Sequence, residues 1–272
     1  MKIALIQLSS CDDPVQNLKT VDAYFDEAVR LGAKFILTPE VTNCVSTSRV
    51  RQEEVLQYEG DDLTLRALRE KARHAGVWCL TGSLALKTND PDGRFVNRSF
   101  LIGPFGHVVA SYDKVHMFDV TVSDTERYHE SKGYRPGDRA VLADTDIGKI
   151  GLTICYDIRF PHLYRQLAQQ GAQILTVPSA FSPITGAAHW ETLLRARAIE
   201  TGAFLLAPAQ TGSHGTRKTY GHSMVVSPWG EVLADAGTET GVICVDIDLT
   251  EVETARSRIP SWRHDNRFEG PA

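Results

Sequence analysis

The spacing of hydrophobic residues along the chain alternates between two patterns, which predict an alternation of strands and helices. Short apolar or alternating runs are typical of β-strands, and apolar residues at three- and four-residue intervals are typical of amphipathic helices. The first pattern predicts strands at 2–8, 34–38, 77–81, 96–102, 107–113, 141–145, 149–155, 173–177, 203–207, 222–227, 231–235 and 242–248. The second pattern predicts helices at 14–31, 63–75, 162–170, 188–201 and 250–257.

Two stretches fit neither pattern. Residues 115–140 have no clear periodicity, and a loop of this length in a compact domain is usually functional or disordered. Residues 260–272 form a polar tail. No linker rich in glycine, serine or proline divides the rest of the chain, and many strands with helices outside them are typical of a layered α/β sandwich. We therefore expect a single domain over 1–259, followed by the tail over 260–272.

The stretch Gly148–Pro161 places a cysteine at a predicted bend. Alternating apolar residues predict a strand that ends at Cys155, and a helical pattern follows Pro161. A strand, a tight turn and a helix with a nucleophile at the turn form a nucleophile elbow, in which the next backbone N–H can stabilise an oxyanion. A thiol suits that position because its thiolate is strongly nucleophilic. On spacing alone, a buried and inert core cysteine is an equal alternative.

Composition narrows the class and the environment of the protein. The chain has 272 residues, a formal net charge of −5 and 42% hydrophobic residues, as in ordinary globular proteins. Lysine and arginine are scattered, which argues against nucleic acid as a partner, and no apolar run reaches the length of a membrane span. The five cysteines have neither zinc-site nor disulfide spacing. We therefore expect no metal site, a reducing compartment and a cytoplasmic location.

Two further ionisable residues follow predicted strands, where the sites of α/β folds tend to gather. Glu40 comes after the apolar run at 34–38, and Lys114 comes after the strand at 107–113. Burial raises the pKa of a carboxyl group, which would suit Glu40 to act as a general base near neutral pH. Each residue also has an ordinary alternative, a loop cap for the glutamate and a solvated edge charge for the lysine.

Three motifs, in this order, resemble those of the nitrilase superfamily, the carbon–nitrogen hydrolases. They are Leu37-Thr-Pro-Glu40, Tyr112-Asp-Lys-Val-His-Met-Phe-Asp119 and Gly151-Leu-Thr-Ile-Cys-Tyr-Asp-Ile-Arg-Phe-Pro161, and the likeness continues through Pro178-Ser-Ala-Phe and Tyr220-Gly-His-Ser. The resemblance implies a four-layer α-β-β-α sandwich that forms a homodimer through the helices beside the elbow. It also implies an enzyme whose catalytic residues are Glu40, Lys114 and Cys155.

The resemblance gives each of these residues a role. Glu40 takes the thiol proton of Cys155, and the sulfur attacks an amide carbon. Lys114 and the backbone N–H of Tyr156 stabilise the oxyanion. Ammonia leaves to give a thioester, which water activated by Glu40 then hydrolyses.

A second glutamate, in the loop between the lysine and the cysteine, is also implied by the resemblance. It would orient Lys114 and the departing amine. Glu130 has the family spacing from the lysine, and Glu126 is the competing candidate. This chemistry implies no metal and no organic cofactor.

Within the superfamily, the sequence is most similar to a branch of amidases that act on deaminated glutathione or on 2-oxoglutaramate. The resemblance implies a small-molecule amide of a 2-oxo acid as substrate, deaminated glutathione in the first place and 2-oxoglutaramate as the alternative. It also implies a role in metabolite repair. A different class, an interaction scaffold that has kept the fold without activity, is disfavoured because Glu40, Lys114 and Cys155 are intact.

Several residues are candidates for binding this substrate. Arg159 would pair with its carboxylate through a bidentate contact, or would form a structural salt bridge on the elbow helix. Arg217 or Lys218 would meet a second carboxylate, or would belong to a solvated polar loop at 211–219. Loop residues expected to line the pocket are Asn43, Ser179, Phe181 and Thr185.

Overall fold

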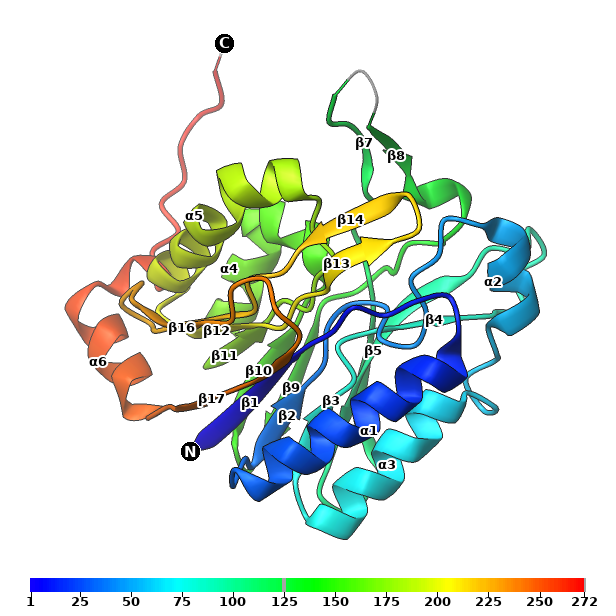
Figure 1. Ribbon diagram of the computed structural model, residues 1–272. Coiled ribbons are helices and arrows are strands. Elements are labelled where there is room, and N and C mark those ends of the chain that lie inside the picture. Colours follow the sequence, from blue (N-terminus) through cyan, green and yellow to red (C-terminus); the bar gives the residue numbers. More distant parts are fainter. Residues whose placement is uncertain (124–125, 272) are drawn as a thin grey trace.

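Two β-sheets lie face to face, and helices cover the outer side of each sheet (Figure 1). The computed structural model describes residues 1–123 and 126–271. Positions 124 and 125 of the unpatterned stretch and Ala272 of the predicted tail therefore lie outside the described residues.

The first sheet has the strand order β17-β1-β2-β3-β5-β4, with β6 paired to β5. Its strands are β1 (Lys2–Gln7), β2 (Phe35–Leu37), β3 (Trp78–Leu80), β4 (Leu84–Leu86), β5 (Val96–Ile102), β6 (Val108–Asp113) and β17 (Gly241–Asp246). The strands β1, β2 and β3 run parallel to one another.

The second sheet has the order β16-β15-β12-β11-β10-β9. Its strands are β9 (Val141–Thr145), β10 (Gly148–Leu152), β11 (Ile174–Thr176), β12 (Phe204–Ala207), β15 (Met224–Val226) and β16 (Val232–Asp235). Here β10, β11 and β12 are parallel. In both sheets the parallel strands lie at the centre, so their carboxyl ends define one edge where a site can form.

The side chains of β1 show how the layers pack. Ile3 and Leu5 point into the core between the sheets, whereas Ala4 and Ile6 pack under the helices α1 (Pro14–Arg30) and α3 (Leu63–Ala75). Side chains of α4 (Pro161–Gln169) and α5 (Pro183–Thr201) join the core on the second sheet. Alternate residues of a strand face opposite sides, so one strand serves two interfaces. The expected four-layer sandwich is confirmed.

The helices α1 and α3 begin and end within one residue of the bounds that the sequence predicts. The Asp13 carboxylate accepts hydrogen bonds from Val15 N and Gln16 N at the start of α1, where Pro14 occupies the first turn. Gly76 ends α3 in the left-handed conformation at φ 63°. By contrast, α5 begins at its own proline and is longer than the predicted 188–201.

Several short elements were not predicted. The unpatterned stretch contains β7 (Asp119–Thr121), β8 (Arg127–His129) and the 3₁₀ helix η1 (Glu130–Lys132). The segment expected to be a polar loop is a hairpin of β13 (Thr211–His214) and β14 (Arg217–Tyr220), and α2 (Arg49–Val55) and β4 were also missed. These elements are short, and all except β4 carry several polar residues, so they lack the periodicity that identifies longer elements.

The predicted tail is attached to the body of the protein at its start. After α6 (Thr250–Arg258) comes the 3₁₀ helix η3 (Pro260–Arg263). The Arg165 guanidinium of α4 donates to the Asp265 carboxylate at 2.6 Å, and Gln169 donates to the same side chain at 2.7 Å. The boundary at 259/260 stays a prediction. Among the described helices, none is both long enough and apolar enough to cross a membrane.

Candidate active site

Three chain segments that follow strands meet at the edge where the parallel strands end. Glu40 comes shortly after β2, Lys114 directly after β6, and Cys155 shortly after β10. The first two segments belong to one sheet and the third to the other. Each of the three side chains is buried, with 4%, 2% and 8% exposure respectively. The fold therefore brings the three predicted catalytic residues into one pocket.

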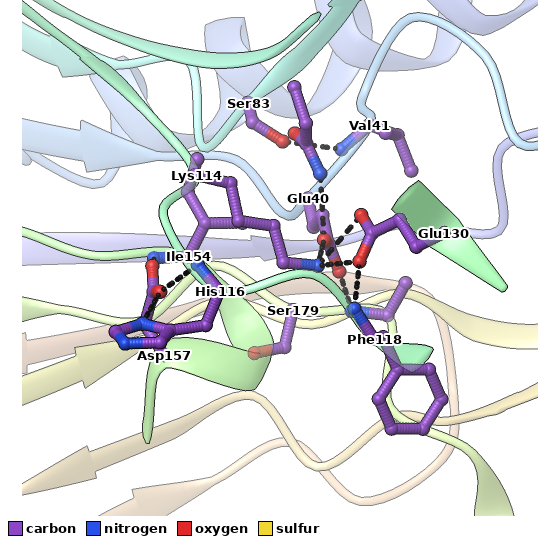
Figure 2. Close-up of polar contacts among 12 residues, drawn as sticks. Glu40, Val41, Ser83, Lys114, His116, Phe118, Glu130, Ile154, Asp157 and Ser179 are labelled. Carbon is purple, nitrogen blue, oxygen red and sulfur yellow. Dashed lines mark hydrogen bonds and ion pairs between the residues drawn. The ribbon is translucent and has the colours of Figure 1, made fainter. Parts of the chain in front are cut away.

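The Lys114 ammonium lies between two carboxylates (Figure 2). Its Nζ is 2.9 Å from Oε1 of Glu40, and 2.9 and 2.8 Å from the two oxygens of Glu130. Burial alone would lower the pKa of this ammonium, but the charges of Glu130 and Glu40 outweigh it and hold the pKa well above its ordinary value. Lys114 is therefore a fixed positive charge in the pocket wall.

The Glu40 carboxylate receives three hydrogen bonds from the protein. Its Oε1 accepts from Asn97 Nδ2 and Lys114 Nζ, each at 2.9 Å, and its Oε2 accepts from Ala180 N at 2.8 Å. Burial raises the pKa of Glu40, but the Lys114 ammonium and the remaining contacts reverse that effect and the pKa lies below its ordinary value. The raised pKa expected from the sequence was wrong, because the expectation counted burial without the paired cation.

Cys155 occupies the sharp turn that the sequence predicts, although β10 ends at Leu152 and not at the cysteine. The cysteine has φ 49°, a conformation rare for residues other than glycine, and opens the 3₁₀ helix η2 (Cys155–Arg159). Its side chain lines the same pocket as the Glu40 carboxylate. Burial and the charge of Glu40 raise the pKa of Cys155, which favours the protonated thiol.

The pocket around these residues has a volume of about 300 Å³. Three of the predicted substrate-binding residues lie in its wall: Tyr156, Phe181 and Thr185. The wall also contains residues of the β7–β8 and β13–β14 hairpins and of the neighbouring loops, among them Val41, Cys44, Phe118, Arg127, Tyr128, Tyr134 and Arg217. An apolar surface with a few charged groups suits a small polar ligand.

Three other predicted residues lie outside the pocket wall. The Asn43 side chain is hydrogen-bonded on both sides to the backbone of Ala85 at 2.9 Å, and Ser179 Oγ donates to Val177 O at 3.0 Å. The hydrogen-bonding groups of both side chains therefore stabilise loops and do not face the pocket. The Arg159 guanidinium carbon lies 5.4 Å from the ring centre of Phe181, and Arg159 itself is not part of the wall.

Two residues of the site were missed or left undecided by sequence reasoning. Asn97 lies within β5 and anchors Glu40 across 57 positions of sequence, a contact that no local pattern reveals. Arg217 was an undecided candidate in a presumed loop; it lies on β14, lines the pocket and donates from Nη2 to Ala180 O at 2.8 Å. The signal available in the sequence for Arg217 was its positive charge, which suits binding of a carboxylate.

The structure separates the two candidates for the second glutamate by their contacts. Glu130 bonds Lys114 and also accepts from Phe118 N at 2.7 Å, whereas Glu126 accepts from the Tyr128 hydroxyl at 2.7 Å and is not part of the pocket wall. Within the described ranges, no group of three or more His, Cys, Asp or Glu side chains is arranged to hold a metal ion.

Comparison with known proteins defines the class to which this fold and site belong. A model of the carbon–nitrogen hydrolase family matches residues 2–257. The chain therefore belongs to the carbon–nitrogen hydrolase family, and the expected nitrilase-superfamily membership and hydrolytic enzyme class are confirmed.

One curated relative and two solved structures show how similar the chain is to individual proteins. A deaminated glutathione amidase of Yersinia enterocolitica is 39% identical over 268 residues, which cover 98% of this chain and 93% of that protein. The NitFhit protein of C. elegans superposes with a TM-score of 0.90 at 36% identity, covering 97% of this chain and 64% of the longer NitFhit chain. A glutamate-to-glutamine mutant of an amidase of Nesterenkonia sp. AN1 superposes with a TM-score of 0.78 at 28% identity over 96% of this chain and 98% of its own. That structure shows the result of Michael addition of acrylamide at the active-site cysteine.

Proposed function

We propose that this protein is a thiol amidase whose substrate is deaminated glutathione, with Cys155 as nucleophile. The observation that carries the proposal is the contact set around one buried ammonium: Lys114 bonds Glu40 and Glu130, and Cys155 lines the same pocket. The relative from Yersinia enterocolitica, similar over almost its whole length, supports the substrate. The cysteine that reacts with acrylamide in a glutamate-to-glutamine mutant of the Nesterenkonia amidase supports a thiol as the nucleophile.

The first chemical step forms a tetrahedral intermediate. The pKa of Cys155 is raised and that of Glu40 is lowered, so proton transfer between them is unfavourable in the free enzyme. The proton therefore passes to Glu40 as the sulfur attacks the amide carbon, not before. The oxyanion is stabilised by the positive charge of Lys114 and by a hydrogen bond from Tyr156 N. Tyr156 lies in the first turn of η2, where backbone N–H groups have no partner within the helix.

The second step breaks the carbon–nitrogen bond. Glu40 returns its proton to the departing nitrogen, and an acyl-thioester remains on Cys155. Water then gives a proton to Glu40 and attacks the thioester. As the carbon–sulfur bond breaks and the acid leaves, Glu40 passes this proton to the sulfur, which restores the thiol. Glu130 keeps the Lys114 ammonium in place throughout, because both of its oxygens bond the same Nζ.

The identity of the leaving group corrects one expectation from the sequence. Ammonia leaves only from a primary amide, such as that of 2-oxoglutaramate. The amide of deaminated glutathione is a peptide bond, so its hydrolysis releases cysteinylglycine together with 2-oxoglutarate. Both substrates give the same acid product, which makes one assay suitable for both.

The test measures 2-oxoglutarate release from deaminated glutathione and from 2-oxoglutaramate by the purified protein. We expect the larger kcat/KM for deaminated glutathione, and a loss of about 10³-fold or more in Cys155→Ala, because the nucleophile is removed. Cys244→Ala, outside the pocket, is the matched control and keeps its activity. Near-normal turnover by Cys155→Ala would contradict the mechanism, and a higher kcat/KM for 2-oxoglutaramate would reassign the substrate.

The proposal extends to the assembly and the compartment of the enzyme. A homodimer through α5 is supported by large apolar side chains that stay exposed on or beside that helix, with 53% exposure at Ile199 and 54% at Trp229. A cytoplasmic location is supported by five cysteines that are all free, because thiols persist in a reducing compartment.

A further inference from the structure

The catalytic residues of the proposed amidase come from two different sheets. Glu40 and Lys114 follow strands of the first sheet, and Cys155 follows β10 of the second. Each segment is tied to its own sheet, Lys114 N to Asn97 O at 3.0 Å and Cys155 N to Pro178 O at 2.9 Å. These bonds leave the distance between the lysine and the cysteine undetermined, so contacts between the sheets must set it.

Asp157 is a fully buried carboxylate, with 0% exposure, that no step of the reaction uses. Its Oδ2 accepts from the Tyr112 hydroxyl at 2.7 Å and from Ile154 N at 2.9 Å. Its Oδ1 accepts from the backbone N–H of His116 at 3.0 Å and lies 2.7 Å from Nδ1 of the same residue (Figure 2). A carboxylate only accepts hydrogen bonds, so Nδ1 carries the hydrogen.

The partners of this carboxylate flank the two catalytic residues. Tyr112 and His116 lie on either side of Lys114, and Ile154 and Asp157 itself lie on either side of Cys155. Three of the four hydrogen bonds therefore run to the lysine segment of the first sheet, and one runs to the cysteine turn of the second.

We propose that Asp157 is a positioning residue that fixes the Lys114 ammonium and the Cys155 sulfur relative to each other across the two sheets. This inference rests on the proposed amidase function. It adds to that function a residue that touches neither substrate nor reacting atoms.

The surroundings of Asp157 make this link rigid. The His116 ring is stacked on Phe160, directly after η2, at 3.5 Å between centroids and 9° between planes, which fixes the direction of Nδ1. The Tyr112 hydroxyl is buried and bonded to a carboxylate, so it remains a donor. Hydrogen bonds to a charged, buried acceptor are stronger than neutral ones, so this link resists displacement.

The positioning role of Asp157 predicts which kinetic constant changes when its hydrogen bonds to the lysine segment are lost. Misplacing a group by about 1 Å can cost about 10² in rate. The wall residues Phe181 and Arg217, which lie on other elements, still bind the substrate. A loosened link therefore lowers kcat and leaves KM nearly unchanged.

The test compares Asp157→Asn with a matched variant elsewhere between the sheets. The asparagine has almost the same shape as the aspartate, but its NH₂ group replaces one of the two oxygens. The two hydrogen bonds that this oxygen accepts are therefore lost. Gln7, on β1, is also buried and also makes four hydrogen bonds. Its Oε1 accepts from Ser223 N and Oγ, next to β15 of the second sheet, and its Nε2 donates to Gly237 O and Glu239 O in the connection between β16 and β17. Gln7→Met removes these four hydrogen bonds, and Gln7 does not line the pocket. This variant therefore reports the effect of lower overall stability without a change at the site.

We expect Asp157→Asn to lose about 10²-fold in kcat with KM within about threefold, and to react with iodoacetamide at Cys155 at least about tenfold more slowly than the wild type. Gln7→Met should lower the melting temperature by a similar amount and keep both rates within about threefold. Full kcat in Asp157→Asn, or an equal loss in Gln7→Met, would overturn the positioning role.

A second pair of variants keeps the inference testable if Asp157→Asn does not fold. His116→Ala removes the Nδ1–H donor, and His116→Asn offers a side-chain N–H in a similar place, so the first should lose kcat and the second should regain part of it. Equal activity of the two would overturn the role. A wild type that hydrolyses neither amide would contradict the proposed function, whereas the alkylation rates would still test the positioning role.

Discussion

At the scale of single residues, the wall of the pocket contains one lysine, Lys114, and two arginines, Arg127 and Arg217. Lys114 is bonded to two carboxylates. Among the described residues, the only hydrogen bond of the Arg217 guanidinium runs to Ala180 O. A guanidinium has five donors in a planar fork that matches a carboxylate. Arg217 therefore has donors left to bind the acidic end of a substrate, whereas Arg159 is not part of that wall.

This difference gives a prediction for the two arginines. Arg217→Gln should raise KM about tenfold or more for an amide that bears a carboxylate, because a charge-assisted contact is lost, and should leave KM for a neutral amide of the same length almost unchanged. Arg159→Gln is the matched comparison and should have the smaller effect. Steady-state kinetics with both amides check this. A larger KM change in Arg159→Gln would assign carboxylate recognition to the elbow helix.

At the scale of elements, the loop that carries Glu40 depends on a glycine from the next strand connection. Gly82 follows β3 with φ 59°, and a Cβ there would lie 1.9 Å from Thr38 O and 2.2 Å from Pro39 O. The next residue supports the same loop, since Val41 N donates to Ser83 Oγ at 2.9 Å. Backbone atoms cannot yield to such a contact without moving the loop, so Gly82 couples the β3–β4 connection to the catalytic base.

Gly82→Ala should therefore lower both stability and activity. We expect a loss of about 2 kcal/mol or more in the free energy of unfolding and about tenfold or more in kcat, because the shifted loop displaces Glu40. Gly76→Ala is the control: its φ is also positive, but nothing lies within 4 Å of the added Cβ. It should cost about 1 kcal/mol and leave kcat unchanged. Denaturant unfolding and kinetics measure both; an intact kcat in Gly82→Ala would contradict the coupling.

What the sequence could not predict lacked either a local pattern or a local partner. The order of Glu40, Lys114 and Cys155 could be read from motifs, and the caps of α1 and α3 from local residues. The β13–β14 hairpin could not, because its two strands have four residues each and no apolar alternation, although they pair with each other. The direction of the Glu40 pKa shift could not be predicted either, because it depends on a lysine 74 positions away.

At the scale of the whole molecule, large apolar side chains stay exposed on the helical layer that covers the second sheet. Along α5, Ile184 and Ile199 are more than half exposed. Trp229, in the turn between β15 and β16, extends this apolar surface, because Gly230 lies directly against Ile199 and Arg195 Nε donates to Gly230 O at 2.9 Å. The first turn of α5 also lines the pocket through Thr185. A second copy packed on α5 would therefore cover apolar surface and support one wall of the site.

The proposed dimer can be separated from other assemblies by one charge. Ile199→Asp would place an aspartate in the interface, where burying an unpaired charge is costly, so we expect the dissociation constant of the dimer to rise about tenfold or more. Val50→Asp is the matched control, since Val50 is 67% exposed on α2, far from α5 in Figure 1. Light scattering over a range of concentrations measures the mass. A monomeric wild type would contradict the dimer, and an unchanged dimer in Ile199→Asp would move its interface to another face.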